Sequence, residues 1–188
     1  FGVPRLREET SRNLSAGLTT RLFGNLSLSV DYYRVAIDDR VVLSGVFDVG
    51  DATIGGVIGD VVGEFPGVAA VQFYVNAVDT TTSGLDLVAD YSHSIGGGSL
   101  KVTAAANFTR TTVDEVHVPK SMEDRFGVVP GGAERVRQIF LGRYGKNLLE
   151  DLLPRRKGTL GLRYDRRGLS AGARANYFGP TVYRSDTE

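Results

Sequence analysis

The residues of this sequence best suited to chemistry are two histidines and a scatter of aspartates. The 188-residue chain has no cysteine, which excludes thiolate catalysis, disulfides and cysteine zinc sites. His93 and His117 are its only imidazoles, and they stand far apart. His117, between two valines, is interpreted as an ordinary loop residue. No Ser-His-Asp order, nucleophile elbow or paired-carboxylate signature can be localised. We therefore expect no catalytic residue and no enzyme activity.

A metal or phosphate site is also not predicted. Asp48, Asp51 and Asp60 could suggest calcium, but their spacing matches neither an EF-hand nor a nonapeptide repeat. Aspartate and glycine are common turn formers, which explains this segment more simply. Residues 55–59 (GGVIG) lack the Lys-Ser/Thr of a phosphate loop and a following helix pattern. The expectation is no metal and no cofactor.

Charge and hydropathy limit the partners. Lys plus Arg equal Asp plus Glu at 22 each, so no net field favours nucleic acid. The short basic clusters at residues 155–157 and 166–167 are interpreted as solvated loops or turns. No run of 18 apolar residues is present, so no transmembrane helix is predicted. Alternating membrane strands remain possible, because alternation lowers the average hydropathy.

The remaining polar residues alternate with apolar ones along six segments. In one segment Leu100, Val102 and Ala104 oppose Lys101 and Thr103. Such period-2 alternation predicts strands whose two faces meet different environments. The expected strands are about 12–23, 25–42, 71–93, 99–113, 157–165 and 168–178. Eight charged or amide residues on these strands are expected to face water in a lumen: Arg21, Asp31, Asp86, Asp90, Lys101, Asn107, Arg163 and Arg174.

The connections between these segments alternate in length. Turn-rich links at residues 24–25, 95–98 and 165–168 predict hairpins, whereas residues 43–70 and 114–156 form long loops. Short periplasmic turns and long extracellular loops are typical of an outer-membrane barrel. The second loop is expected to carry one short helix, about 133–153, ended by Pro154. Its apolar stripe is expected to pack onto the barrel rim: Ile139, Phe140, Tyr144, Leu148 and Leu152.

Aromatic residues occur near both ends of the expected strands. Phe23, Tyr91 and Tyr164 lie beside the short turns, and Tyr32, Phe108 and Tyr177 lie further along. Two rows of aromatic residues are expected at the two interfaces of a membrane barrel. The alternative is that these aromatics cap the core of a soluble sandwich.

The number of strands favours the membrane interpretation. Even the smallest barrels with a filled interior use about eight strands, so six cannot close around one. A compact soluble barrel would bury Asp86, Asp90, Lys101 and others, at a cost of several kcal/mol for each unpaired ion. The fold expected is therefore all-β: an antiparallel up-and-down meander that forms a six-stranded arc of a large transmembrane barrel.

Several motifs resemble the barrel of TonB-dependent receptors. Residues 6–17 are similar to the family's strand entry L-x-P-E-x-S-x-N-x-x-x-G, with Glu8 in place of proline. Residues 26–34 (LSLSVDYYR) with 37–41 (IDDRV) resemble its next strand. Residues 75–77 (VNA) and 82–86 (TSGLD) resemble its return into the membrane. Residues 154–157 and 174–179 (RANYFG) resemble a late hairpin.

The resemblance implies a 22-stranded barrel, of which residues 1–188 would supply six strands, with about four more after Glu188. It also implies partners: outer-membrane lipid, the receptor's own plug domain, TonB and a small extracellular ligand. The implied function is uptake of a scarce nutrient (siderophore, cobalamin, glycan or similar) across a Gram-negative outer membrane. The alternatives are a soluble β-rich adhesion module and a passive porin. Two unpaired edge strands predict that the isolated fragment self-associates.

Overall fold

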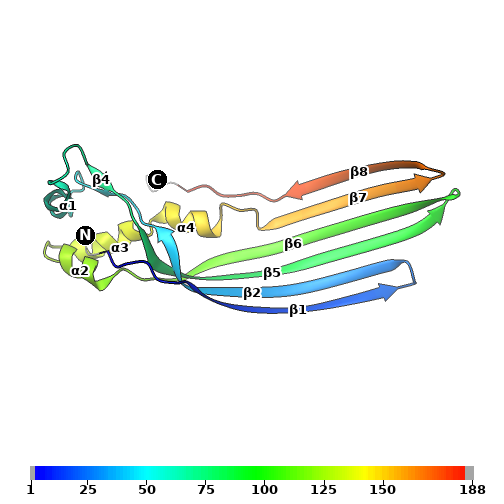
Figure 1. Ribbon diagram of the computed structural model, residues 1–188, viewed down its shortest axis with the longest axis horizontal. Coiled ribbons are helices and arrows are strands. Elements are labelled where there is room, and N and C mark those ends of the chain that lie inside the picture. Colours follow the sequence, from blue (N-terminus) through cyan, green and yellow to red (C-terminus); the bar gives the residue numbers. More distant parts are fainter. Residues whose placement is uncertain (1–2, 185–188) are drawn as a thin grey trace.

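The computed structural model describes residues 3–184, so the strands expected after Glu188 lie outside the described residues. Its main element is a six-stranded antiparallel sheet in the order β1-β2-β5-β6-β7-β8. Each strand pairs with its neighbour in the chain, which confirms the up-and-down meander (Figure 1). β1 and β8 are unpaired edges, so the sheet is an open arc among these residues.

Four of the six strands, β1, β2, β5 and β6, are longer than a membrane crossing needs. The six strands are β1 (Thr10–Leu22), β2 (Leu26–Leu43), β5 (Tyr74–Ile95), β6 (Gly98–Val116), β7 (Arg156–Arg166) and β8 (Leu169–Phe178). A tilted membrane strand needs ~9–11 residues, so the 22 residues of β5 extend outside it. β5 begins at Tyr74 and not at residue 71, because Val71 pairs with Phe47 in a separate small sheet.

The three short turns take the backbone conformation of tight hairpins. Gly96 and Gly97 have φ of 60° and 75°, and Arg167 and Gly168 have 48° and 82°. Two successive positive φ values match the twist of the flanking strands, and glycine adopts them without a steric penalty. The turns thereby set the register in which each strand pairs with the next.

The two long loops fold together at the end of the sheet opposite the short turns (Figure 1). We call residues 44–73 and 117–155 the cap. It contains β3 (Phe47–Asp48), β4 (Ala70–Val71), α1 (Gly55–Val62), α2 (Lys120–Phe126), α3 (Gly132–Phe140) and α4 (Arg143–Glu150). The expectation of one helix over 133–153 is wrong, because the chain leaves the helical conformation at Leu141 and Gly142. The glycine-rich residues 55–59 also lie inside a helix.

The Asp51 side chain stabilises the turn that leads into α1. Its Oδ1 accepts the backbone N–H groups of Thr53 and Ile54 at 2.9 and 3.1 Å. These bonds order the turn that precedes the helix, whose N-cap residue is Ile54 and which has no side-chain cap of its own. Ile58 and Val62 then face the same side, four residues apart, and both are buried. The helix therefore forms because an ordered turn leads into it and one of its faces is apolar.

The buried core of the described residues lies in the cap and at the adjoining strand ends. Phe47, Phe126 and Phe140 are fully buried, and Phe47 stacks on Phe73 and Phe126 at centroid distances of 5.4 and 5.9 Å. The predicted rim-packing stripe is therefore only partly correct. Phe140 joins the core, but Tyr144 and Leu148 are 38% and 39% exposed. No helix in this part of the chain is long and apolar enough to span a membrane.

Candidate transport surface

The strand register places the eight predicted polar residues on one face of the sheet. Asp31 pairs with Asp86, which pairs with Asn107 across β2, β5 and β6. Lys101 pairs with Arg163 across β6 and β7. Cross-strand partners point to the same side of a sheet. The members of this face, which we call the polar face, are Arg21, Asp31, Asp86, Asp90, Lys101, Asn107, Arg163 and Arg174.

Side chains of the polar face satisfy one another by hydrogen bonds. The Asn107 amide donates to Asp86 Oδ1 at 2.6 Å, and the Thr103 hydroxyl donates to Asp90 Oδ1 at 2.6 Å. Lys101 Nζ lies 3.6 Å from the same Asp90 oxygen. The carboxylates of Asp86 and Asp90 are thus satisfied by donors on the same face.

Glycines on the polar face allow large side chains to lie flat on the sheet. The Tyr33 ring lies directly over Gly84, its cross-strand partner, where a Cβ atom would overlap the ring. The Asp31 carboxylate occupies the equivalent space over Gly17. Because these side chains lie flat, they leave the surface of the sheet above them open.

A shallow groove of ≈ 480 Å³ crosses the polar face over β6, β7 and β8. Gly161 and Gly172 form part of its floor, and Lys101, Arg163 and Arg174 contribute positive charge to its lining. Thus the structure brings three of the eight predicted residues together in one groove of the polar face.

The opposite face of the sheet, the apolar face, carries the predicted aromatics of the strands. These are Tyr32, Tyr91, Phe108, Tyr164 and Tyr177, whereas Phe23 lies in the first turn and is 92% exposed. Tyr32 and Phe108 both pair with Leu85, six positions from Tyr91. At about 3.4 Å per residue, the two aromatic rows stand roughly 20 Å apart along the strand.

The cap contains a larger open hollow of ≈ 880 Å³. Its lining includes four cationic and two acidic side chains: Arg135, Arg137, Arg143, Lys146, Asp48 and Asp51. Arg135 Nε donates to Asp51 Oδ2 at 2.8 Å. Burial alone would raise the pKa of Asp51, but the backbone bonds from Ile54 and Thr53 and the Arg135 pair lower it overall. The carboxylate is therefore held ionised.

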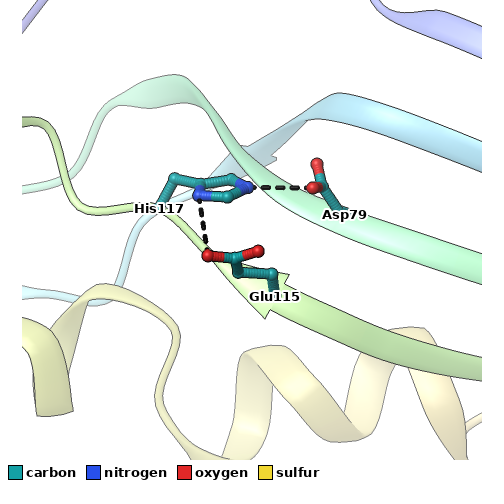
Figure 2. Close-up of side chains that lie close together, drawn as sticks. All are labelled: Asp79, Glu115 and His117. Carbon is teal, nitrogen blue, oxygen red and sulfur yellow. Dashed lines mark hydrogen bonds and ion pairs between the residues drawn. The ribbon is translucent and has the colours of Figure 1, made fainter.

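His117, which the sequence alone suggests is an ordinary loop residue, lies between two carboxylates. His117 Nε2 is 2.9 Å from Asp79 Oδ2, and Nδ1 is 3.6 Å from Glu115 Oε1 (Figure 2). The hydrogen bond to Asp79 is the largest cause that raises the pKa of His117, against partial burial. Glu115 and His117 are two residues apart at a strand end, but only the pairing of β5 with β6 brings Asp79 beside them.

These three residues form the one group of possible metal ligands among residues 3–184, with one atom from each lying within 4.8 Å of the others. The two carboxylates approach different nitrogens of the same ring (Figure 2). One metal ion binds only one nitrogen of an imidazole. The two carboxylates therefore favour the protonated form of the ring, in which both nitrogens donate, and this agrees with the raised pKa of His117.

Residues 6–17 and residues 75–77, two of the motifs that resemble the receptor family, contact each other in the structure. The Arg7 backbone N–H donates to Asn76 Oδ1 at 2.7 Å, and Asn76 Nδ2 donates to the Arg7 carbonyl at 3.0 Å. Glu9 Oε1 accepts the backbone N–H of Val41 at 2.6 Å. Two segments that resembled one family separately thus contact each other at the base of the cap.

Comparison with known families agrees with this arrangement. The model of the TonB dependent receptor-like, beta-barrel family matches residues 1–188, the whole chain. No curated protein sequence matches the chain. The chain belongs to the TonB-dependent receptor β-barrel family, a family of outer-membrane transport receptors.

Proposed function

We propose that this chain forms part of the wall and extracellular cap of a receptor that takes up a scarce nutrient with energy from TonB. The observation that supports this most is the two-faced sheet. One face presents leucine, alanine and aromatic residues, the other presents matched polar residues, and neither is covered by a core among the described residues. A sheet between hydrocarbon and an aqueous bore has this pattern.

In this proposal each surface has a separate role. The polar face lines the bore, where Asp86, Asn107 and Arg174 contact water, the plug domain or the passing solute. The two aromatic rows fix the depth of the wall in the outer membrane. The open hollow of the cap, ≈ 880 Å³, is large enough for a small extracellular ligand, such as a siderophore, cobalamin or glycan. The isolated chain, with both faces and both edges free, would self-associate.

Uptake measurements in a Gram-negative strain that lacks the receptor gene test the proposal. Cells carrying the receptor should accumulate a candidate nutrient, and accumulation should stop when TonB is deleted or a protonophore is added. Uptake that continues without TonB and without the proton gradient would make the protein a passive pore. An intact protein that fractionates entirely with soluble material would make it an adhesion module.

A further inference from the structure

Three arginines lie on the apolar face at its outer aromatic row, two of them just beyond the row and one level with it. Arg34 of β2 and Arg110 of β6 both pair with Ser83 of β5, so the three residues form a line across adjacent strands. Arg34 follows Tyr32 by two positions, and Arg110 follows Phe108 by two positions. Arg156 of β7 pairs directly with Phe108. We call Arg34, Arg110 and Arg156 the arginine row.

The arginine row has no counter-ion among residues 3–184. None of its guanidinium groups takes part in an ion pair, and all three residues are exposed. Nearby arginines at other positions are paired: Arg12 with Asp38 at 2.9 Å and Arg7 with Asp39 at 3.1 Å. The arginine row therefore lies near paired arginines, but no acid among residues 3–184 neutralises its own charges.

Unneutralised cations at these positions repel one another. Arg34 and Arg110 are separated by one strand, about 10 Å at the usual strand spacing. Arg110 and Arg156 are diagonal neighbours on adjacent strands, about 7–8 Å apart at Cα. Like charges this close destabilise a sheet unless an anion lies between them. Long, flexible arginine side chains can reach one anion from both sides.

A groove beside the row combines an apolar floor with cationic walls. Its volume is ≈ 340 Å³, and its lining includes Tyr32, Leu85, Phe108, Arg110, Arg155 and Arg156. Arg155 is already engaged by Asp151, whereas Arg110 and Arg156 have no such partner. An amphiphile with a negative head and an apolar body complements such a groove: the head reaches the arginines and the body covers the rings.

The position of the row relative to the aromatics sets its depth in a membrane. Tyrosine rings on the outer surface of a barrel lie at the level of lipid headgroups. Arg34 and Arg110 lie two residues, about 7 Å, beyond the aromatic row, and Arg156 lies level with it, so all three remain within the headgroup region. A guanidinium there meets lipid phosphates, and its planar fork binds phosphate oxygens through two parallel hydrogen bonds.

We propose that the arginine row is a binding site for the phosphate of an anionic lipid headgroup in the outer leaflet of the membrane. The lipid neutralises the row and clamps β2, β5, β6 and β7 at the base of the cap. This inference depends on the membrane placement of the wall and is independent of which nutrient the receptor transports. Loss of uptake and loss of lipid binding are therefore separable results.

The test measures lipid binding to the complete receptor, purified in neutral detergent, by native mass spectrometry. The probes are bisphosphorylated lipid A, the same lipid with its phosphates removed, and inorganic phosphate alone. We expect the phosphorylated lipid to bind, the dephosphorylated lipid to bind at least about tenfold more weakly, and inorganic phosphate not to compete. One charge-assisted hydrogen bond accounts for a change of that size.

Variants then assign the binding to the row. R34Q/R110Q should weaken binding of the phosphorylated lipid about tenfold or more, whereas R34K/R110K should retain most of it. The matched control is R21Q/R174Q, which removes two exposed arginines from the polar face and should bind as the wild type does. Heat-dependent gel mobility verifies that each barrel is folded, and added salt should weaken binding to the wild type.

Three results would overturn the proposal. Equal binding of phosphorylated and dephosphorylated lipid would show that the groove recognises only the apolar body. Equal loss in R34Q/R110Q and R21Q/R174Q would show a general effect of charge. Competition by inorganic phosphate at the concentration of the lipid would show a free-anion site. If R34Q/R110Q fails to fold, the wild type alone decides: lipid binding that does not weaken when salt is added would also overturn the proposal.

Discussion

The six-stranded sheet, which we call the wall, exposes the same apolar residue types that the cap buries. On the apolar face of the wall, Leu18 is 70% exposed and Leu162 is 46% exposed, although both lie within regular strands. In the cap, Phe47, Phe126 and Phe140 have no exposed surface. A chain in one solvent would bury its apolar residues throughout. The proposed placement of the wall in hydrocarbon and of the cap in water would account for this difference.

The source of stability differs in the same way. The cap is stabilised by a packed apolar core, where removing atoms leaves a cavity. Between the aromatic rows the wall has no such core, and its strands are joined by ladder hydrogen bonds and by polar networks such as Asn107 with Asp86. A substitution should therefore affect the cap through volume and the wall through polarity and the face it occupies.

The largest effect is expected from Phe140→Ala in the cap. Deleting a fully buried phenyl ring costs about 3–5 kcal/mol, so the cap should open locally while the wall stays folded. Hydrogen exchange of the detergent-solubilised receptor measures this, with Leu18→Ala as the control that changes little. Equal protection losses in the two variants would remove the distinction between cap and wall.

A charge on the apolar face should have the next largest effect. Leu87 and Val88 are neighbours on opposite faces of β5, the first paired with Val30 and Ala106, the second with Ser29. Leu87→Arg should cost about 2–4 kcal/mol in a bilayer, because arginine would enter hydrocarbon. Val88→Arg should be tolerated, because it enters the polar face between Asp86 and Asp90.

Denaturant titration of folding into lipid vesicles measures both variants. Equal costs for Leu87→Arg and Val88→Arg would show that the two faces meet the same solvent.

Two crowded glycines provide a smaller contrast. A Cβ at Gly45 in the cap would collide with the backbone carbonyl of Ile139, which cannot turn away. Gly45→Ala should therefore cost about 1–3 kcal/mol, as overpacking does. At Gly84 the obstacle is the end of the Tyr33 side chain, which can rotate into water. Gly84→Ala should cost less than Gly45→Ala, and thermal melts of the two receptors compare them.

The smallest effect concerns His117 at the junction of wall and cap. Because Asp79 raises the pKa of His117 above its usual 6.5, the pair stabilises the junction fully below pH 6.5. That contribution is lost as the pH rises through the folded pKa, and it amounts to no more than about 1 kcal/mol for a half-exposed pair.

Asp79→Asn should lower the pKa of His117 measured by NMR and should remove this pH dependence. A His117 pKa that is identical in the two proteins would contradict the ion pair.

The wall was predictable from sequence because its signal is local. Alternation of residues such as Leu100, Lys101 and Val102 reports the two faces, and glycine pairs such as Gly96-Gly97 report the turns. The register then follows, and the eight residues predicted for the polar face do share one face.

The cap was not predictable because its contacts join distant segments. Asp51 bonds Arg135 from the other long loop, and His117 meets Asp79 only through strand pairing. Leu141 and Gly142 interrupt an apolar pattern that appeared continuous, so one predicted helix became two. The arginine row was also hidden, because Arg34 and Arg110 align only across Ser83.

The most direct test of whether the two faces of the sheet meet different solvents is a cysteine scan of residues 85–90 in the complete receptor, reconstituted in lipid vesicles. Residues 1–188 contain no cysteine, so once any cysteine elsewhere in the receptor is replaced by serine, a spin label attaches only at the introduced position. Labels at 85, 87 and 89 should be accessible to oxygen dissolved in lipid, and labels at 86, 88 and 90 to a water-soluble nickel complex. Accessibility without this period of two, or with the opposite phase, would contradict the account.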